Sequence, residues 1–311
     1  MGPPDRAGEA SSAEARDFPQ ISRKFIMFVK SAGQVFDLAS HAVPGEIGLR
    51  LPVACAAARE AGSLARRRFN GRPGLSSINL KGHQDYLSAV DAEVEALLRL
   101  RLLESFPEDS FFGEEGGGSF DNNVWVVDPV DGTANFVRGI SQFCISLAYV
   151  RGGQTQIGII YDPMADEMFV AERGRGATLN GELIRVSGLE EIGSSTIEAG
   201  WSNRLPFSQY VDLIGRLLGD GAGIRRGGSG ALALAYVSAG RLDGYCELHM
   251  NSWDALAGLL LIEEAGGWVN DFLANDGLRN GNGVLGCTPG LRERLVRLTG
   301  VVSSSGPPPR L

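Results

Sequence analysis

Apolar residues at helical spacing mark two helices in the first part of the chain. Residues 47–69 are rich in Ala and Leu and predict one helix. Residues 88–106 predict a second helix, because Val90 and Val94 fall on one face of it and Pro107 stops it. We therefore expect the folded part of the chain to begin with a pair of helices.

From residue 110 onward, short apolar runs alternate with turn residues. Gly, Asp and Asn separate the runs, which predicts a meandering antiparallel sheet. Asn180-Gly181 is a strong signal for a hairpin turn. The runs that predict strands are residues 111–112, 124–127, 144–150, 157–161 and 168–171.

After residue 194 the pattern changes to strands that alternate with helices, which is typical of a layered α/β arrangement. The predicted strands are residues 197–200, a short strand near 224, 244–248, 268–272 and 284–287. The predicted helices are residues 207–218, 230–239, 253–265 and 291–298.

These changes of pattern divide the chain into four parts. Residues 1–44 form an N-terminal extension that we expect to be largely disordered, because acidic residues are mixed there with Ser, Ala, Gly and Pro. Residues 45–190 form a half with an antiparallel sheet, and residues 191–300 form an α/β half. Residues 301–311 are rich in Ser and Pro and predict a disordered tail.

Composition and charge exclude several classes of function. The chain has 311 residues, 43% of them apolar, which is enough to bury a large core. Its net charge of −8 argues against non-specific binding to nucleic acid, which requires a basic face. The apolar runs are too short to cross a bilayer and no secretory signal is evident, so we expect a cytoplasmic protein. The four cysteines include no CxxC pair, which favours reduced thiols over a zinc site.

Three clusters combine carboxylates with glycines at the edges of apolar runs, and they are the candidates for chemistry. The first is Gly113-Glu114-Glu115-Gly116. The second is WVVDPVDGTANF, residues 125–136, and the third is WDALAGLLLIEEAGG, residues 253–267.

The second cluster suits a hard cation. We expect Asp128 to end a buried strand, because Pro129 cannot continue a central strand. Asp131 then opens a turn, so that both carboxylates can converge on one point with the Val130 carbonyl between them. Carboxylate and carbonyl oxygens suit Mg²⁺ or Ca²⁺.

Each cluster also has a simpler interpretation. Asp254 begins a predicted helix and could merely cap it, whereas Asp128 and Asp131 could form an Asp-rich turn. Glu114 alone could be a solvated loop residue. The occurrence of all three clusters together favours a metal site. Gly132-Thr133 would start a short helix whose N–H groups could hold a phosphate.

The three clusters together resemble the signature motifs of the inositol monophosphatase family of metal-dependent phosphatases. In that family the motifs read GEE, WxxDPxDGTxNF and WDxAxGxxxxxEAGG, and all three occur here in the same order. The third motif departs at Leu256, where the family usually has Ala. The resemblance extends from residue 50 to residue 298. It implies an α/β fold, an alternating α-β-α-β-α sandwich of the inositol monophosphatase and fructose-bisphosphatase type, with metals at the junction of the two halves.

The resemblance also implies a set of metal ligands. Glu114, Asp128 and the Val130 carbonyl look like the ligands of a first Mg²⁺. Asp128, Asp131 and Asp254 look like the ligands of a second. Members of the family often bind a third, weaker ion near the position of Glu114.

Further positions match residues that act on the substrate. Asp91 lies in a segment similar to the family's DxxTxxD element and would orient the Thr133 hydroxyl, which helps to activate the attacking water. Glu114, Thr133 and Asp91 are thus the implied catalytic residues. The implied substrate-binding residues are Asp131, Gly132, Thr133, Ser229, Gly230 and Glu247.

Physical chemistry agrees with a metal-dependent phosphatase. A phosphate monoester dianion repels hydroxide, and two cations roughly 3.5–4 Å apart can neutralise that charge and lower the pKa of a bound water. No His, Cys or Ser nucleophile is then required. The three histidines are scattered along the chain. Two interpretations of His249 are about equally good: a residue at the surface, or a residue at the edge of the substrate site near Glu247.

The leading interpretation is a Mg²⁺-dependent hydrolase of inositol-1-phosphate or a similar small polyol phosphate. Histidinol-phosphate phosphatase is the main alternative; its cationic substrate would favour extra acids near Glu247, for which Asp243 is the candidate. Fructose-1,6-bisphosphatase, phosphoadenosine-phosphate phosphatase and a non-catalytic binding member of the family are further alternatives. The resemblance also leads us to expect a homodimer, and we expect neither nucleic acid nor a membrane as a partner.

Overall fold

The computed structural model describes residues 47–71, 79–82, 85–87 and 89–301. All of them belong to one compact unit. The predicted extension over residues 1–44 and the predicted tail beyond Val301 lie outside the described residues. None of the helices in the described ranges has the length and the apolar character that a bilayer crossing requires.

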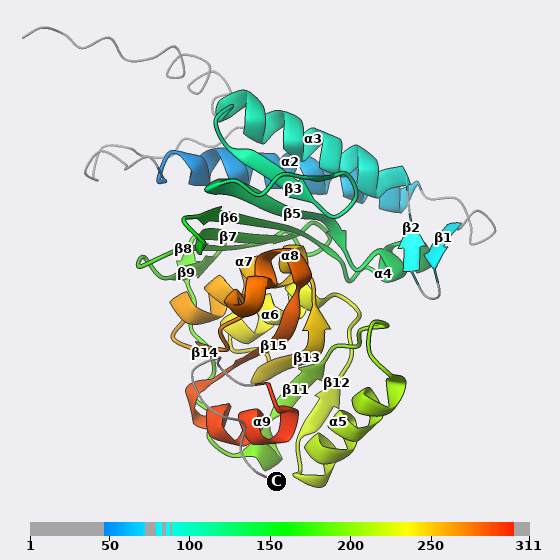
Figure 1. Cartoon of the computed structure of the whole chain (residues 1–311), viewed down its shortest axis with the longest axis vertical. Helices are drawn as coiled ribbons and strands as arrows, with labels where there is room; N and C mark the ends of the chain where they lie inside the picture. The colour runs from blue at the N-terminus through cyan, green and yellow to red at the C-terminus, as the bar shows by residue number, and fades with distance from the viewer. Residues whose placement is uncertain (1–46, 72–78, 83–84, 88, 302–311) are drawn as a thin grey trace, which may run out of the picture. The chain divides into compact units, whose positions relative to one another are not determined.

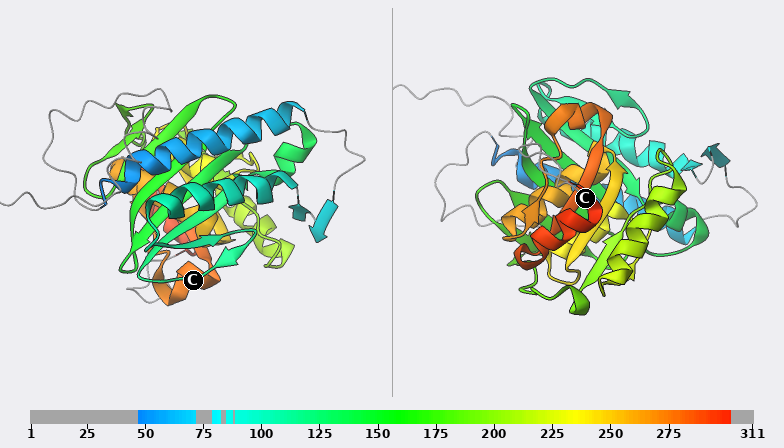
Figure 2. Two further views of the ribbon diagram at one scale, coloured as in Figure 1. Left: turned by 90° about the horizontal axis from the view of Figure 1, so that it is seen from above. Right: turned by 60° about the horizontal axis from the view of Figure 1, so that its bottom comes forward.

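Helices and sheets alternate in five layers (Figure 1), which confirms the predicted α/β sandwich. One pair of helices covers the outer face of an eight-stranded sheet, a second pair lies between the two sheets, and a third pair covers the outer face of a five-stranded sheet. From above, the first pair runs side by side across its sheet (Figure 2). The pairs are α2 (Arg50–Asn70) with α3 (Ala89–Ser105), α6 (Gly230–Ser238) with α7 (Ser252–Glu264), and α5 (Phe207–Gly219) with α9 (Arg292–Thr299).

The first large sheet has the strand order β10-β9-β8-β7-β6-β5-β3-β4. Its strands are antiparallel except for β3 and β5, which pair in parallel, so the prediction of a wholly antiparallel meander was wrong for this pair. The chain folds back at β4 on the outer side of β3 and then crosses to the other side of β3 to enter β5. Asn180 and Gly181 form the predicted hairpin turn, both with positive φ. The strands are β3 (Ser110–Gly113), β4 (Gly117–Gly118), β5 (Asn123–Asp131), β6 (Cys144–Arg151), β7 (Gln154–Asp162), β8 (Glu167–Glu172), β9 (Ala177–Leu179) and β10 (Glu182–Leu183).

Strand β5 does not end at Asp128, as the sequence had led us to expect, but continues through Pro129 to Asp131. Asp128 pairs with Ser146 and Asp131 pairs with Cys144, so β5 carries one extra residue between these two pairs. Such a bulge accepts a proline, because the residue there needs no ladder hydrogen bond. The bulge also brings the two aspartates to the end of the strand.

The second large sheet has the order β12-β11-β13-β15-β14 and follows the predicted alternation. Strand β14 is shorter than predicted, because the Asn270 side chain takes over the pairing: it donates to the Gly283 carbonyl at 2.9 Å and accepts from the Leu285 N–H at 2.8 Å. The strands are β11 (Thr196–Ala199), β12 (Gly223–Arg225), β13 (Gly244–Met250), β14 (Trp268–Val269) and β15 (Asn282–Cys287). Shorter elements are β1 (Asn79–Gly82), β2 (Asp85–Leu87), α4 (Thr133–Arg138) and α8 (Gly277–Asn280).

The middle layer of helices contacts the eight-stranded sheet closely. A Cβ on Gly158 of β7 would lie 2.6 Å from the Ala257 carbonyl of α7, and one on Gly258 of α7 would lie 2.4 Å from Leu234 of α6. These small residues allow the backbones to approach. The N-terminal ends of α6 and α7 are thereby held beside the end of β5, where the candidate site lies.

Candidate active site

Three acidic side chains from two elements meet at one point. Asp128 and Asp131 come from the end of β5, and Asp254 comes from the first turn of α7. One carboxylate oxygen of each lies within 4.8 Å of the others. Only 2% of Asp128 and 8% of Asp131 is exposed. The three residues that the sequence analysis assigned to a second Mg²⁺ are therefore neighbours in space.

The cluster is electrostatically unfavourable without a cation. Burial raises the pKa of Asp128 well above its ordinary value, and the negative charges of Glu114, Asp254 and Asp131 raise it further. The pKa of Asp254 is also well raised, first by burial and then by Asp131 and Glu114. Glu114 thus lies near enough to act on both aspartates. A bound dication would offset this repulsion.

Asp131 connects the eight-stranded sheet to the start of α6. Its Oδ2 accepts a hydrogen bond from the Ser229 hydroxyl at 2.5 Å and another from the Ala231 N–H at 2.8 Å. Burial raises the pKa of Asp131, while the Ser229 hydroxyl and the N–H groups of α6 oppose that rise. Because both bonds use Oδ2, Oδ1 is the oxygen that could bind a cation.

Thr133 contacts two of the predicted site residues. Its Oγ1 lies 3.1 Å from Asp91 Oδ1 and 3.0 Å from the Val130 carbonyl oxygen. The Asp91 carboxylate is fully buried on α3. Gly132 precedes α4 with φ of 100°, and a Cβ there would lie 2.9 Å from the Gln142 carbonyl, so this turn requires glycine.

Glu114 lies in a turn that α3 holds in place. The Glu114 N–H donates to the Val127 carbonyl at 3.1 Å. The next two N–H groups, of Glu115 and Gly116, donate to the Glu95 carboxylate at 2.8 and 3.0 Å. Glu95 is only 4% exposed. A buried carboxylate of α3 therefore fixes the turn that carries the first predicted metal ligand.

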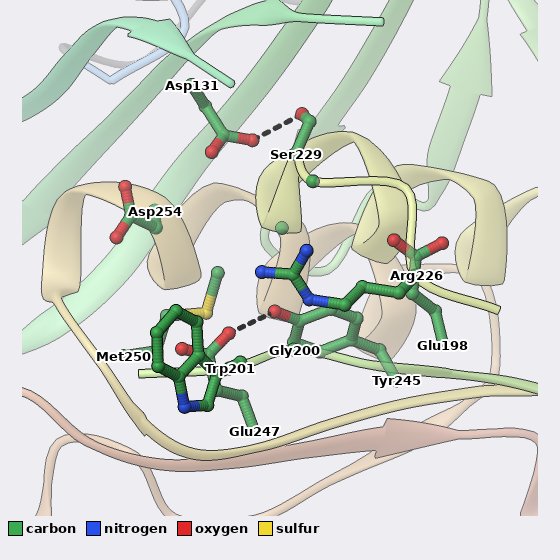
Figure 3. A pocket seen from close by; sticks show the side chains of 12 residues that line it. Asp131, Glu198, Gly200, Trp201, Arg226, Ser229, Tyr245, Glu247, Met250 and Asp254 are labelled. Carbon is green, nitrogen blue, oxygen red and sulfur yellow. Dashed lines mark hydrogen bonds between the residues drawn. The ribbon is translucent and has the colours of Figure 1, made fainter. Parts of the chain in front are cut away.

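A cavity of about 180 Å³ adjoins the acidic cluster (Figure 3). Glu247 lines it, and its carboxylate accepts a hydrogen bond from the Tyr245 hydroxyl at 2.5 Å. Burial raises the pKa of Glu247 to about 7. The predicted substrate-binding residues Ser229 and Gly230 also line the cavity. Its lining residues are Asp131, Glu198, Gly200, Trp201, Arg226, Gly228, Ser229, Gly230, Tyr245, Glu247, Met250 and Asp254.

Five side chains of this cavity were not predicted from the sequence, namely Glu198, Trp201, Arg226, Tyr245 and Met250. They lie on or directly after β11, β12 and β13, which are parallel to one another. The carboxyl ends of parallel strands meet at one edge of a sheet, where ligands commonly bind. The alternation of strands and helices after residue 194 was thus a signal that could have identified Trp201 and Arg226.

Two residues considered in the sequence analysis lie outside the cavity lining. Asp243, the candidate extra acid, accepts hydrogen bonds from the Ser187 hydroxyl at 2.6 Å and the Thr196 N–H at 2.8 Å, so its role is structural. His249 Nε2 lies 3.1 Å from the Asn280 carbonyl oxygen. Glu198 is the additional acid that lines the cavity, and Arg225 forms an ion pair with it.

Comparison with known proteins assigns the family. The model of the inositol monophosphatase family matches residues 50–303. The chain belongs to the inositol monophosphatase family. This family is of the phosphatase type and is generally dependent on Mg²⁺.

Several family members resemble the chain over most of their length. Nus factor SuhB of Pseudomonas aeruginosa is 39% identical over 248 residues, which is 76% of this chain and 91% of the relative. An inositol-1-monophosphatase of Rhizobium meliloti is 41% identical over 217 residues, 68% of this chain and 81% of the relative. The crystal structure of the extragenic suppressor protein SuhB from Bartonella henselae has a TM-score of 0.74 and 34% identity, and the match covers 82% of this chain and 98% of that one.

Proposed function

We propose that this protein is a Mg²⁺-dependent hydrolase of small phosphate monoesters, and that inositol-1-phosphate or a similar polyol phosphate is its substrate. The observation that carries the proposal is the cluster of Asp128, Asp131 and Asp254 beside a cavity, with Asp128 buried and Asp254 partly exposed. Its carboxylates repel one another and are hard oxygen ligands, which is the donor set that Mg²⁺ prefers. Membership of a phosphatase family supports the same chemistry.

The residues that would hold the metal are those that the resemblance implied. Glu114, Asp128, Asp131, Asp254 and the Val130 carbonyl would hold two or three Mg²⁺ ions. When bound, such ions neutralise the charge of the phosphoryl group and lower the pKa of the attacking water.

The chain itself would position the water and the phosphate. Thr133 has a single hydroxyl proton and two acceptors within reach, Asp91 and the Val130 carbonyl. When the proton is donated to Asp91, an oxygen lone pair of Thr133 is left to accept a hydrogen bond from the attacking water. The N–H groups of Gly132 and Thr133, at the start of α4, would hold the phosphate oxygens.

The cavity would receive the alcohol part of the substrate. The Glu247 carboxylate and the Tyr245 hydroxyl lie 2.5 Å apart and could bind hydroxyl groups of a polyol. Histidinol phosphate is less favoured, because Asp243 does not line the cavity and Arg225 already neutralises Glu198. The inositol-1-monophosphatase named among the relatives supports the polyol substrate.

Phosphate release by the purified protein tests the proposal. We expect Mg²⁺-dependent release from inositol-1-phosphate, with Asp128→Asn and Asp254→Asn each reducing it at least about a hundredfold. Asp212→Asn, an exposed residue of α5, is the matched control. A panel with histidinol phosphate, fructose-1,6-bisphosphate and phosphoadenosine phosphate would reveal a different preference. Release that is independent of Mg²⁺ would contradict the mechanism.

A binding member without catalytic activity is the second candidate. It is favoured by the relatives at 38–40% identity that carry the name Nus factor SuhB, which does not describe a hydrolase. For this candidate we expect Mg²⁺ to raise the melting temperature while no substrate of the panel is hydrolysed. Turnover of any of these substrates that the aspartate variants abolish would exclude it.

A further inference from the structure

The cavity contains one cationic side chain among its described lining residues, Arg226. Four of the other lining side chains are acids, listed here as Asp131, Glu198, Glu247 and Asp254. An acidic cavity would repel an anionic substrate unless bound metal and this arginine compensate for it. The position of Arg226 therefore indicates where in the cavity an anionic group of the substrate can bind.

Arg226 is available for a ligand, unlike its neighbour Arg225. Arg225 is committed to an ion pair with the buried Glu198, and the Gly227 N–H donates to the same carboxylate at 2.6 Å. Arg226 is exposed and has no ion-pair partner among the described residues. Its guanidinium extends into the cavity, with Cζ 5.9 Å from the centre of the Trp201 ring (Figure 3).

Arg226 and the acidic cluster belong to the same cavity. Ser229 follows Arg226 by three residues, and its hydroxyl lies 2.5 Å from Asp131. Figure 3 shows Asp131 and Asp254 on one side of the cavity and the Arg226 guanidinium on the side of Trp201. A substrate whose scissile phosphate lies at the cluster would therefore extend its alcohol part toward Arg226.

We propose that Arg226, supported by Trp201, binds a second phosphoryl group of the substrate, so that sugars or polyols with two phosphates are favoured over those with one. The proposal rests on the proposed function, since it assumes that one phosphate lies at the acidic cluster. A guanidinium presents a planar fork of N–H donors that matches two oxygens of a phosphate, and a ring against its face leaves that fork free.

None of the four acids depends on Arg226 as a direct hydrogen-bond or ion-pair partner among the described residues. Glu198 is already paired with Arg225, and Asp131 is stabilised by the Ser229 hydroxyl and the Ala231 N–H. The Tyr245 hydroxyl donates to Glu247. Three of the four acids thus have other partners, and the fourth, Asp254, belongs to the cluster that a dication would bind.

A comparison of two substrates tests the proposal. We would measure kcat/KM for phosphate release from fructose-1,6-bisphosphate and from fructose-1-phosphate, and take their ratio. Arg226→Gln is expected to lower this ratio about tenfold or more, because the bidentate contact is lost. Arg226→Lys, which keeps the charge but not the fork, is expected to restore part of the ratio. Arg297→Gln, an exposed arginine of α9, is the control and should leave it unchanged.

The outcomes separate this proposal from the proposed function. A ratio that changes less than about twofold in Arg226→Gln, while phosphate is still released, would contradict the second phosphate site alone. If the wild-type protein hydrolyses neither of these two substrates nor inositol-1-phosphate, the proposed function fails. In that case, calorimetric titration of the protein with fructose-1,6-bisphosphate in the presence of Ca²⁺ tests whether Arg226 contributes to binding. Binding about tenfold weaker in Arg226→Gln than in the wild type supports the site, and equal binding or none contradicts it.

Discussion

The Thr133 hydroxyl is the smallest group on which the proposed chemistry depends. Its oxygen lies 3.1 Å from a fully buried Asp91 carboxylate and 3.0 Å from the Val130 carbonyl. A single proton cannot be donated to both acceptors at once. If a cation occupies the Val130 carbonyl, Asp91 is the remaining acceptor, and the orientation of the hydroxyl is then fixed.

Replacing this hydroxyl should lower kcat by a much larger factor than it changes the affinity for Mg²⁺. For Thr133→Val, which keeps the shape, we expect kcat to fall about a hundredfold, because the group that orients the water is lost. The Mg²⁺ concentration for half-maximal activity should change less than about threefold, since the carboxylates are untouched. Steady-state kinetics against Mg²⁺ measure both quantities.

The control for this change is Thr178→Val on β9, far along the sheet, which should behave as the wild type. Asp91→Asn keeps an acceptor oxygen, and we expect a smaller loss of about tenfold. Wild-type kcat in Thr133→Val would show that the hydroxyl plays no part in the reaction.

At the scale of residues, the sequence could predict those positions that lie in contiguous motifs. Asp128, Asp131 and Asp254 were predicted as one group and meet within 4.8 Å. Trp201 and Arg226 were not predicted, because each lies one or two residues after a short strand and neither side chain belongs to a matched motif, although Arg226 lies three residues before the predicted Ser229. Their roles arise only when parallel strands bring their ends together.

At the scale of elements, helix α3 supports the turn between β3 and β4. Glu95 accepts hydrogen bonds from two consecutive N–H groups of the turn that follows Glu114, and Arg99 donates to the same carboxylate at 3.1 Å. The contact is close, since a Cβ on Gly113 would lie 2.3 Å from Glu95 Oε2. Glu95 is thus a positioning residue for a predicted metal ligand.

Removing the Glu95 carboxylate should weaken metal binding. We expect Glu95→Ala to raise the dissociation constant for Mg²⁺ about tenfold, because the turn loses its fixed position. The free energy of unfolding should fall by about 1 kcal/mol, since two partly buried N–H groups lose their acceptor. Calorimetric titration with Mg²⁺ and urea unfolding measure the two effects.

Two variants distinguish positioning from a general loss of structure. Glu95→Gln keeps one acceptor oxygen and should give an intermediate Mg²⁺ affinity. Glu104→Ala lies on the same helix but is exposed, so its Mg²⁺ affinity should equal that of the wild type. Equal Mg²⁺ affinities in Glu95→Ala and Glu104→Ala would rule out the positioning role.

The elements themselves were largely predictable, and the exceptions have local causes. Periodicity predicted the long helices to within a few residues, because each has a long apolar face. The end of β5 was predicted wrongly, because a proline normally terminates a central strand and the bulge that accepts Pro129 depends on the partner strand β6. The parallel pairing of β3 and β5 also depends on strand order, which periodicity does not specify.

At the scale of the whole molecule, the site lies where the layers join. Asp131 of the eight-stranded sheet is bonded to α6, Asp254 lies at the start of α7, and Glu247 comes from the five-stranded sheet. The sequence could predict that these distant segments converge, because their motifs matched those of a family. The homodimer that we also expected remains a prediction. Buried acids from both sheets make the stability of the whole molecule depend on pH.

Without metal, the protein should lose stability as pH rises from about 4 to about 7. Folding raises the pKa of Glu247 to about 7 and raises those of Asp128 and Asp254 well above their ordinary values. Between the unfolded and folded pKa values the folded state binds protons that the unfolded state has released. The free energy of unfolding therefore falls as pH increases through this window.

Mg²⁺ should reverse this trend, because a dication can replace the protons that the buried acids hold at low pH. We expect the melting temperature in EDTA to be lower at pH 8 than at pH 5, and the rise on adding Mg²⁺ to be larger at pH 8. Asp128→Asn should flatten the pH dependence in EDTA, since a neutral amide does not titrate, whereas the exposed Asp212→Asn should keep it. A melting temperature in EDTA that increases steadily from pH 5 to pH 8 would mean that other groups outweigh the buried acids. The repulsion that we assign to the empty cluster would then be too weak to require a cation.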